Sequence, residues 1–325
     1  MGQAPIIDIH VDEADLFEHM KEECRVGLLR DPKEIPPKFF YDARGSALFE
    51  EITGLPEYYQ TRTERKILGE VASVIEARHH FRQLLEFGSG SSSKTRVLLD
   101  AMHESGDLEL YLPLDVSESI VRTTAEQLVE DYPELQVHGI IADFTRHLEQ
   151  IPRGEHRLVA FLGGTIGNFL PAEATRFLRE VAATMGPDDR LLLGADLVKE
   201  TRRIEAAYND SQGVTARFNL NALAVVNARL GADFDLENYD HLAPYREDVQ
   251  WIEMRLRARR SRRVRIPALN VEIQIEAGEE ILTEISRKFT RESAEQMLNS
   301  AGLETTDWFT DAEDLFGLSL SRRRR

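Results

Sequence analysis

Short apolar runs that alternate with helical patterns place the strongest limit on the fold of this chain. Five such runs occur, nearly all ending in Asp or Gly, at residues 81–88, 108–115, 135–143, 156–164 and 189–196. After Pro171, apolar positions recur three and four residues apart, as in an amphipathic helix, until Gly186 and Pro187 end the pattern. The alternation predicts an α/β fold with a doubly wound, mainly parallel sheet, whose ligands bind outside the carboxyl ends of the strands.

The pattern changes near residue 198. Two helical segments follow, and then strands in which apolar and polar residues alternate, as in half-exposed antiparallel sheets. We therefore predict an inserted α+β accessory domain at 198–288 in a core at 61–197, and a C-terminal helix and strands at 289–325 that complete the core sheet. That helix is expected to begin after Thr290, a favoured N-cap residue.

The segment "LLEFGSGSSSKTRVLL" at 84–99 combines a strand, a glycine-rich turn and a helix start, which together present backbone N–H groups to a ligand. Three interpretations compete. A phosphate-binding Walker A loop, as in a nucleotide-hydrolysing enzyme, and a dinucleotide fingerprint both require glycine where Ser93 stands. The Glu-x-Gly-x-Gly loop of S-adenosylmethionine enzymes matches Glu86, Gly88 and Gly90 without a defect, and it is the interpretation that we favour.

Acidic residues at the ends of the following strands support a nucleoside ligand. In this interpretation Asp115 accepts hydrogen bonds from both ribose hydroxyls, while Asp143 and Phe144 hold the adenine amino group and ring. The competing interpretation of the two Asp residues is helix capping, because loops from strand to helix often end in Asp. Three acids on three successive strands favour the nucleoside, and Ser89 and Lys94 of the glycine-rich loop are further cofactor-binding candidates.

A second glycine cluster, "FLGGTIGNF" at 161–169, ends the fourth apolar run. Glycine permits positive φ and a close approach to the backbone. Gly163, Gly164 and Gly167 therefore mark another candidate site at the carboxyl end of a strand.

The composition limits the possible partners. Acidic residues outnumber basic ones by 57 to 40, and the net charge of −17 would repel a phosphate backbone, so we expect no nucleic-acid partner. Arginines that alternate with apolar residues at 257–266 favour a solvated strand face. No run approaches the roughly 18 apolar residues of a spanning helix, no secretory pattern opens the chain, and Cys24 is its single cysteine. We expect a cytoplasmic protein with no membrane partner and, because the histidines show no metal-ligand spacing, no metal ion.

Four motifs connect the chain to a known family: "PPKFFYD" (36–42), "LPEYYQTRTE" (55–64), "FLGGTIGN" (161–168) and "LTEIS" (282–286). With them the chain resembles the L-histidine Nα-methyltransferases of ergothioneine biosynthesis over nearly its full length. The resemblance implies a class I, Rossmann-like methyltransferase core with an inserted accessory unit. It also implies transfer of three methyl groups from S-adenosylmethionine to the α-amino group of histidine, which gives hercynine. In this family an acid commonly stands at the position of Ser93.

The strand that contains "LTEIS" suits recognition of an imidazole ring. Glu284 and Ser286 are two residues apart, so on a strand both point to one face, where a carboxylate and a hydroxyl can bind the two ring nitrogens. A surface acid is the alternative for Glu284, but its apolar neighbours favour burial, and a buried acid needs a partner. By resemblance the partner is the ring of the substrate, which Tyr58 also reaches and against which Met254 packs. Without the family, Met254 would be interpreted as core.

The resemblance assigns further residues to the amino-acid part of the substrate. Asn168 and Tyr208 would bind the carboxylate, and Asn168 and the carbonyl group of Gly163 would bind the amine. Tyr41 and Phe49 match positions near the amine, and we take Tyr41 and Asn168 as the catalytic candidates. The N-terminal segment at 1–60 is thus expected to contribute to the substrate pocket.

Two other classes of function stay open. One is a methyltransferase for another amino acid or a peptide amine, and the other is a non-catalytic nucleoside-binding subunit. We expect L-histidine as the small-molecule partner and a monomeric protein.

Overall fold

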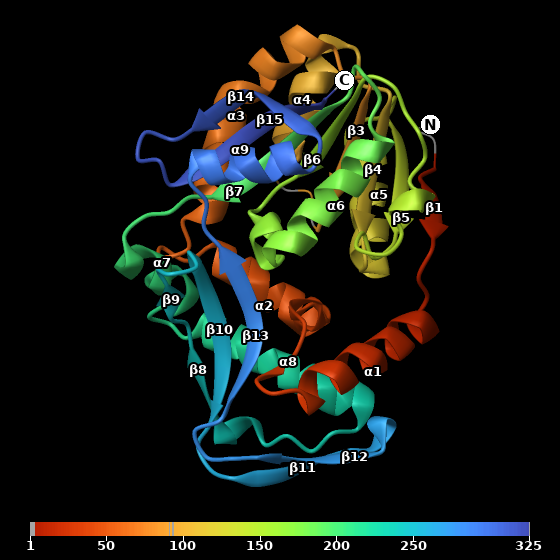
Figure 1. Ribbon diagram of the computed structural model, residues 1–325. Helices are drawn as coiled ribbons and strands as arrows, with labels where there is room; N and C mark the ends of the chain where they lie inside the picture. Colours follow the sequence, from red (N-terminus) through yellow and green to blue (C-terminus); the bar gives the residue numbers. More distant parts are fainter. Residues whose placement is uncertain (1–3, 91, 93, 325) are drawn as a thin grey trace. The chain divides into compact units, whose positions relative to one another are not determined.

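The computed structural model describes residues 4–90, 92 and 94–324 (Figure 1). Ser93, at which two interpretations of the glycine-rich loop fail, lies outside these residues. The chain divides into two compact units. The core unit comprises the residues up to Val11, Gln60–Val198 and the chain from Phe289 onward, and the accessory unit comprises Asp12–Tyr59 and Lys199–Lys288. The segment 1–60, expected as one piece, is therefore shared between the two units.

An eight-stranded sheet forms the centre of the core unit, in the order β1-β5-β4-β3-β6-β7-β15-β14. Its parallel strands are β1 (Ile6–Ile9), β3 (Gln83–Phe87), β4 (Leu110–Asp115), β5 (Gln136–Ile141), β6 (Arg157–Phe161) and β7 (Arg190–Asp196). The antiparallel strands are β14 (Leu303–Thr310) and β15 (Phe316–Arg323), which pairs with β7. The predicted doubly wound, mainly parallel α/β fold is confirmed, and β3 to β7 lie within the five apolar runs. The edge strand β1 is a feature that the sequence patterns did not predict.

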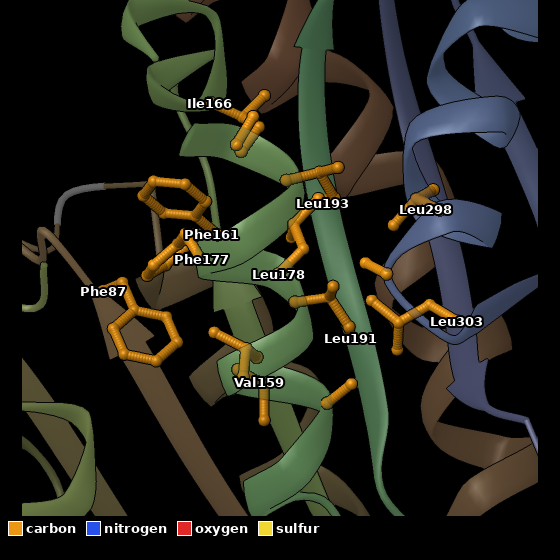
Figure 2. Packing of buried hydrophobic residues seen from close by; sticks show 14 of the residues in the cluster. Phe87, Val159, Phe161, Ile166, Phe177, Leu178, Leu191, Leu193, Leu298 and Leu303 are labelled. Atoms are coloured by element: carbon orange, nitrogen blue, oxygen red, sulfur yellow. The ribbon is translucent and has the colours of Figure 1, made fainter. Parts of the chain in front are cut away.

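Helices cover both faces of this sheet (Figure 1). One face carries α3 (Gln60–His79), α4 (Arg96–Ser105) and α5 (Glu118–Asp131), and the other carries α6 (Pro171–Thr184) and α9 (Arg291–Ser300). Figure 2 shows part of the buried cluster under α6 and α9, where Phe177, Leu178 and Leu298 pack against strand residues. Burial on both faces explains why the parallel strands are continuous apolar runs in the sequence. Thr290 caps α9 as predicted, because its hydroxyl oxygen accepts a hydrogen bond from the Ser293 N–H at 3.1 Å.

The accessory unit combines helices with a sheet in the order β2-β13-β10-β8, in which β9 also pairs with β10. A separate two-stranded ribbon consists of β11 and β12. The strands are β2 (Lys33–Glu34), β8 (Tyr239–Leu242), β9 (Tyr245–Arg246), β10 (Trp251–Ala258), β11 (Arg262–Ile266), β12 (Val271–Ile275) and β13 (Glu280–Arg287). The α-helices are α1 (Glu13–Leu29), α2 (Ala43–Thr53), α7 (Thr201–Tyr208) and α8 (Val214–Leu230). Short 3₁₀ turns in the two units are η1 (Pro37–Phe40), η2 (Leu148–Gln150), η3 (Thr165–Asn168), η4 (Leu236–Asn238) and η5 (Pro267–Leu269).

A β-bulge interrupts the antiparallel pairing of β10 with β13. Met254 pairs with Glu284, whereas the next residue of β10, Arg255, pairs with Leu282. Thr283 is therefore an extra residue in β13, without a partner in the ladder.

The bulge decides which residues of β13 are buried. Strict alternation would place Glu284 on the face opposite Ile281, but the extra residue brings both onto one face, and both are buried. Thr283 Oγ1 lies 2.6 Å from Asn219 Oδ1 and 2.9 Å from the carbonyl oxygen of Met254. These contacts join the bulge to α8 and to β10.

The arginine-rich stretch forms a solvated strand face, as predicted. Its side chains make exposed ion pairs across the β-strands and turns of the accessory unit: Arg257 with Glu280, Arg259 with Asp240, Arg262 with Asp235, Arg263 with Glu272 and Arg265 with Asp233. None of the helices in the described ranges combines the length and the apolar character that a membrane-spanning helix needs.

Candidate active site

The glycine-rich loop between β3 and α4 meets the end of β4 in the core unit. Gly88 and Gly90 have φ angles of 63° and 50°, a left-handed conformation that favours glycine. Asp115, the last residue of β4, accepts hydrogen bonds from the N–H groups of Gly90 at 3.1 Å and Ser117 at 3.0 Å. Burial raises the pKa of Asp115, and these N–H groups act in the opposite direction. The structure thus brings Gly90 and Asp115 together, as cofactor binding requires.

Glu86 holds this loop from inside the core. It is 3% exposed, and its carboxylate accepts hydrogen bonds from the hydroxyl groups of Thr95, at the start of α4, and Tyr111. Burial raises the pKa of Glu86 to about 7, while the two hydrogen bonds lower it. Because both oxygens are bound within the core, Glu86 supports a ligand site through the loop that it anchors.

Lys94 lies in an ion pair that the sequence patterns did not indicate. Its ammonium group is 2.5 Å from a carboxylate oxygen of Glu64, a fully buried residue of α3. The same carboxylate accepts the Gly163 N–H at 2.8 Å. A Cβ atom on Gly194 would overlap this carboxylate, so the glycine in β7 makes room for Glu64. Glu64 therefore connects the glycine-rich loop to the second glycine cluster.

Asp143 and Phe144 follow β5 beside the glycine-rich loop. Asp143 is buried, and one of its carboxylate oxygens accepts hydrogen bonds from the backbone N–H of Thr145 at 2.9 Å and the hydroxyl of Thr145 at 2.6 Å. A Cβ atom on Gly88 would stand 3.9 Å from the Phe144 ring, which brings these two residues together. The hydroxyl group of Ser89 is buried and has no hydrogen-bond partner within residues 4–90, 92 and 94–324. A polar ligand bound at this loop would supply the hydrogen bond that the buried hydroxyl group lacks.

The second glycine cluster turns the chain sharply at the end of β6. Gly163 and Gly164 have φ angles of 79° and 70°, and Gly164 is the N-cap of η3. The turn therefore requires glycine for its conformation as well as for close approach. Asn168 ends η3, and its half-buried amide makes no hydrogen bond to the described residues.

The accessory unit brings together three of the residues expected around the imidazole ring. Met254 and Glu284 are direct neighbours across β10 and β13, and Ser286 lies on the same face of β13. Glu284 is only 8% exposed, and its carboxylate has no hydrogen-bond partner in the described part of the chain. Burial raises the pKa of Glu284 to about 7, and the charge of Lys288 lowers it. The site therefore offers a buried, unsatisfied acid beside a hydroxyl group.

Tyr208 and Lys288 extend this group of polar side chains. The Tyr208 hydroxyl donates to Ser286 Oγ at 2.9 Å. The ammonium group of Lys288 donates to Ser286 Oγ at 2.9 Å and to Tyr208 Oη at 3.0 Å. The sequence analysis missed Lys288, although it continues the two-residue spacing of Glu284 and Ser286 and so carried a usable signal.

Aromatic residues from α2, α8 and the chain on either side of α2 form a cluster in the same unit. The ring centroid of Phe49 lies 5.6 Å from that of Tyr41 and 6.2 Å from that of Tyr58. Phe218 of α8 joins the cluster, with centroids 5.5 Å from Tyr41 and 5.9 Å from Phe49. The structure thus groups the three expected aromatic residues, and adds Phe218, which in the sequence is marked only as an apolar helix position.

The expected substrate residues belong to both units. Gly163 and Asn168 are part of the core unit, whereas Tyr41, Tyr58, Tyr208, Met254, Glu284 and Ser286 are part of the accessory unit.

One set of potential metal ligands, Glu76, His80 and Asp107, is close enough to share an ion. These residues already have protein partners. His80 Nδ1 lies 2.8 Å from Asp107 Oδ2, and Glu76 accepts a hydrogen bond from the Ser105 hydroxyl at 3.1 Å. The contacts account for the set without an ion, and the absence of a metal stays a prediction.

Comparison with known proteins gives a consistent family. The family described as histidine-specific, S-adenosylmethionine-dependent methyltransferases matches residues 20–323. The histidine N-alpha-methyltransferase of Mycolicibacterium smegmatis is 48% identical over 306 residues, which cover 94% of this chain and 95% of that protein. The histidine N-alpha-methyltransferase of Mycobacterium tuberculosis is 44% identical over 304 residues, which cover 94% and 95% of the two chains.

A fungal relative is longer. The ergothioneine biosynthesis protein 1 of Neurospora crassa is 31% identical over 307 residues, which cover 90% of this chain but 34% of that protein. The family match extends over nearly the whole chain and agrees with the glycine-rich loop, the parallel sheet and the buried acid. The chain belongs to the histidine-specific, S-adenosylmethionine-dependent methyltransferases.

Proposed function

We propose that this protein transfers three methyl groups from S-adenosylmethionine to the α-amino nitrogen of L-histidine and so forms hercynine, the first step of ergothioneine biosynthesis. The observation that carries the proposal is the Glu284 carboxylate, buried and without a hydrogen-bond partner among the described residues, next to the Ser286 hydroxyl on the same strand face. A buried acid costs free energy unless a partner satisfies it, and an imidazole N–H is such a partner. The family and the names of the bacterial relatives support the same substrate.

The cofactor part of the proposal assigns S-adenosylmethionine to the carboxyl ends of β3, β4 and β5. Gly88 and Gly90 would let the ligand approach the backbone, and the unpartnered hydroxyl of Ser89 would bind a polar group. Asp115 would hold the ribose hydroxyls. Asp143 and Phe144 would contact the adenine amino group and ring. Lys94 would reach the cofactor from its position beside Glu64, and Glu86 would act through the loop.

The substrate part assigns the imidazole ring to Glu284, Ser286 and Tyr58, with Met254 packed against it. Asn168 would bind the carboxylate, and Asn168 and the Gly163 carbonyl would bind the amine. Tyr208, which the resemblance also assigned to the carboxylate, donates its one hydroxyl hydrogen to Ser286 Oγ, so we assign it to the support of Ser286 instead. The half-buried amide of Asn168, without a partner in the described ranges, supports a role in ligand binding.

S-adenosylmethionine, when bound, supplies an electrophilic methyl group. The work of the protein is to align the amine with that group, since holding reactants near attack geometry can lower the barrier by several kcal/mol, roughly 7–11 in the best cases. The α-ammonium group of histidine is mainly protonated at neutral pH and must lose its proton before it can react. Asn168 would orient the amine, and the faces of Tyr41 and Phe49 would accommodate the cation that grows with each methyl group.

The proposal includes a monomeric, cytoplasmic protein with no nucleic-acid or membrane partner and no metal ion. The net charge of −17 supports the lack of a nucleic-acid partner, and the single cysteine fits a reducing compartment. Sedimentation velocity at several protein concentrations would test the monomer.

Mass spectrometry tests the function directly. The protein is incubated with S-adenosylmethionine and histidine, and in parallel with phenylalanine, tryptophan or a histidine-containing peptide. We expect histidine to gain one, two and three methyl groups. Methylation of another amine with none on histidine would replace the proposed function by a different methyltransferase, and the absence of methylation on every amine would favour a non-catalytic nucleoside-binding protein.

A further inference from the structure

A buried lysine beside the proposed imidazole site has no role in the function described so far. Lys288 follows β13 directly and is 2% exposed. Its ammonium nitrogen lies 2.9 Å from Ser286 Oγ, 3.0 Å from Tyr208 Oη and 4.6 Å from the centroid of the Tyr208 ring. Burying an ammonium group is costly, so these contacts have to be strong to hold it there.

The contacts determine the direction of the hydrogen bonds. An ammonium group has three donors and no acceptor, so both hydroxyl oxygens accept from Lys288. The Tyr208 hydroxyl in turn donates to Ser286 Oγ. A hydroxyl oxygen accepts at most two hydrogen bonds and donates one. Ser286 therefore accepts twice inside the protein and has only its own O–H left for a ligand.

Glu284 has the opposite polarity. Its carboxylate can only accept, it lies on the same strand face as Ser286, and it has no partner in the part of the chain that the structure describes. The face thus presents one acceptor and one donor, two residues apart.

We propose that Lys288 is a positioning residue that fixes Ser286 as a hydrogen-bond donor, so that the site selects a ring with one N–H, directed at Glu284, and one bare nitrogen, directed at Ser286. The inference rests on the proposed function and adds to it a selection of the neutral imidazole in a single tautomer. A ring without the second nitrogen leaves the O–H of Ser286 buried and unpaired. In a doubly protonated ring, the second N–H points at the O–H of Ser286, and two donors cannot form a hydrogen bond. A lysine that only fills space would give the site no such polarity.

Substrate analogues distinguish a changed hydrogen-bond polarity of the site from a loss of protein stability in the variant. The two pyrrolylalanine isomers each keep one ring N–H and replace the other nitrogen by CH. The ratio of kcat/KM for histidine to kcat/KM for the better isomer measures recognition of the bare nitrogen. We expect this ratio to be roughly tenfold or more in the wild type and to fall several-fold towards one in Lys288→Met, because the Ser286 hydroxyl is then free to reorient. The control Lys33→Met removes another lysine of the accessory unit, bonded to Glu279 at 2.6 Å, and should leave the ratio unchanged.

A second measurement does not depend on the folding of the variant. ¹⁵N NMR of ring-labelled histidine, bound to wild-type protein with S-adenosylhomocysteine, should show one protonated and one bare nitrogen.

A second variant tests the role of Ser286 itself. Ser286→Ala should lower the kcat/KM ratio as Lys288→Met does. An equal mixture of tautomers in the wild type, or an unchanged ratio in both variants, would overturn the inference even if histidine is methylated. If the wild type leaves histidine unmodified, the proposed function itself fails.

Discussion

Replacing Glu284 by Gln should stabilise the protein at neutral and alkaline pH while it impairs activity on histidine. Glu284 is 8% exposed, and burial raises its pKa from 4.5 to about 7. When the pKa of a carboxyl group is higher in the folded than in the unfolded state, ionisation of that group lowers the free energy of unfolding. The stability that protonated Glu284 contributes is thus fully present below pH 4.5 and is lost as the pH rises through 7.

The shift sets the size of the effect. A pKa change from 4.5 to about 7 corresponds to about 3 kcal/mol of unfolding free energy, at about 1.4 kcal/mol per pKa unit. Glutamine has nearly the same shape as the protonated acid and does not ionise. We therefore expect Glu284→Gln to exceed the wild type by about 3 kcal/mol near pH 8.5 and to match it near pH 4.5, with the change concentrated between these values.

Urea unfolding at a series of pH values measures the difference. Other titrating groups, such as Glu86 with its pKa also near 7, are common to both proteins and cancel. The matched control is Glu280→Gln on the same strand, because Glu280 is only half-buried and already has cationic partners, Arg257 at 2.7 Å and Arg255 at 3.5 Å. It should cost at most about 1 kcal/mol and show no gain that increases with pH. A stability difference between Glu284→Gln and wild type that is constant from pH 5 to 8.5 would refute the assignment of a strained, buried carboxylate.

Three further predictions concern specificity, the cofactor and the core. Glu284→Ala should lose most of its kcat/KM for histidine and relatively little for phenylalanine or tryptophan, and an equal loss on all substrates would place Glu284 elsewhere in the mechanism. Asp115→Ala should weaken binding of S-adenosylmethionine tenfold or more with the fold retained, and an unchanged affinity by calorimetry would remove its ribose role. Gly194→Ala should destabilise the protein by roughly 1–3 kcal/mol in urea because its Cβ overlaps Glu64, whereas Gly69→Ala in α3, with open space around it, should not; equal stabilities would contradict the packing.

The sequence predicted the core sheet because each of its central strands carries its own signal. Strands buried on both faces must be apolar along their whole length, and β3 to β7 are found inside the runs read from the sequence. The change of pattern near 198 likewise follows from local alternation, and the Thr290 cap from local hydrogen bonding. The edge strand β1 is missing from the prediction because four residues are too few to show a period.

The sequence also predicted that Glu284 and Ser286 share a face, because a strand has a period of two. Which face they share was decided by the bulge at Thr283, since one extra residue reverses the side on which every later residue lies. Contacts between distant segments were likewise decided by the tertiary structure: Glu64 reaches Lys94 and Gly163, and Lys288 reaches Tyr208. Local sequence sets periodicity and capping, but the register between strands and the partner of a buried charge depend on which remote segments pack together, and only the folded chain determines that.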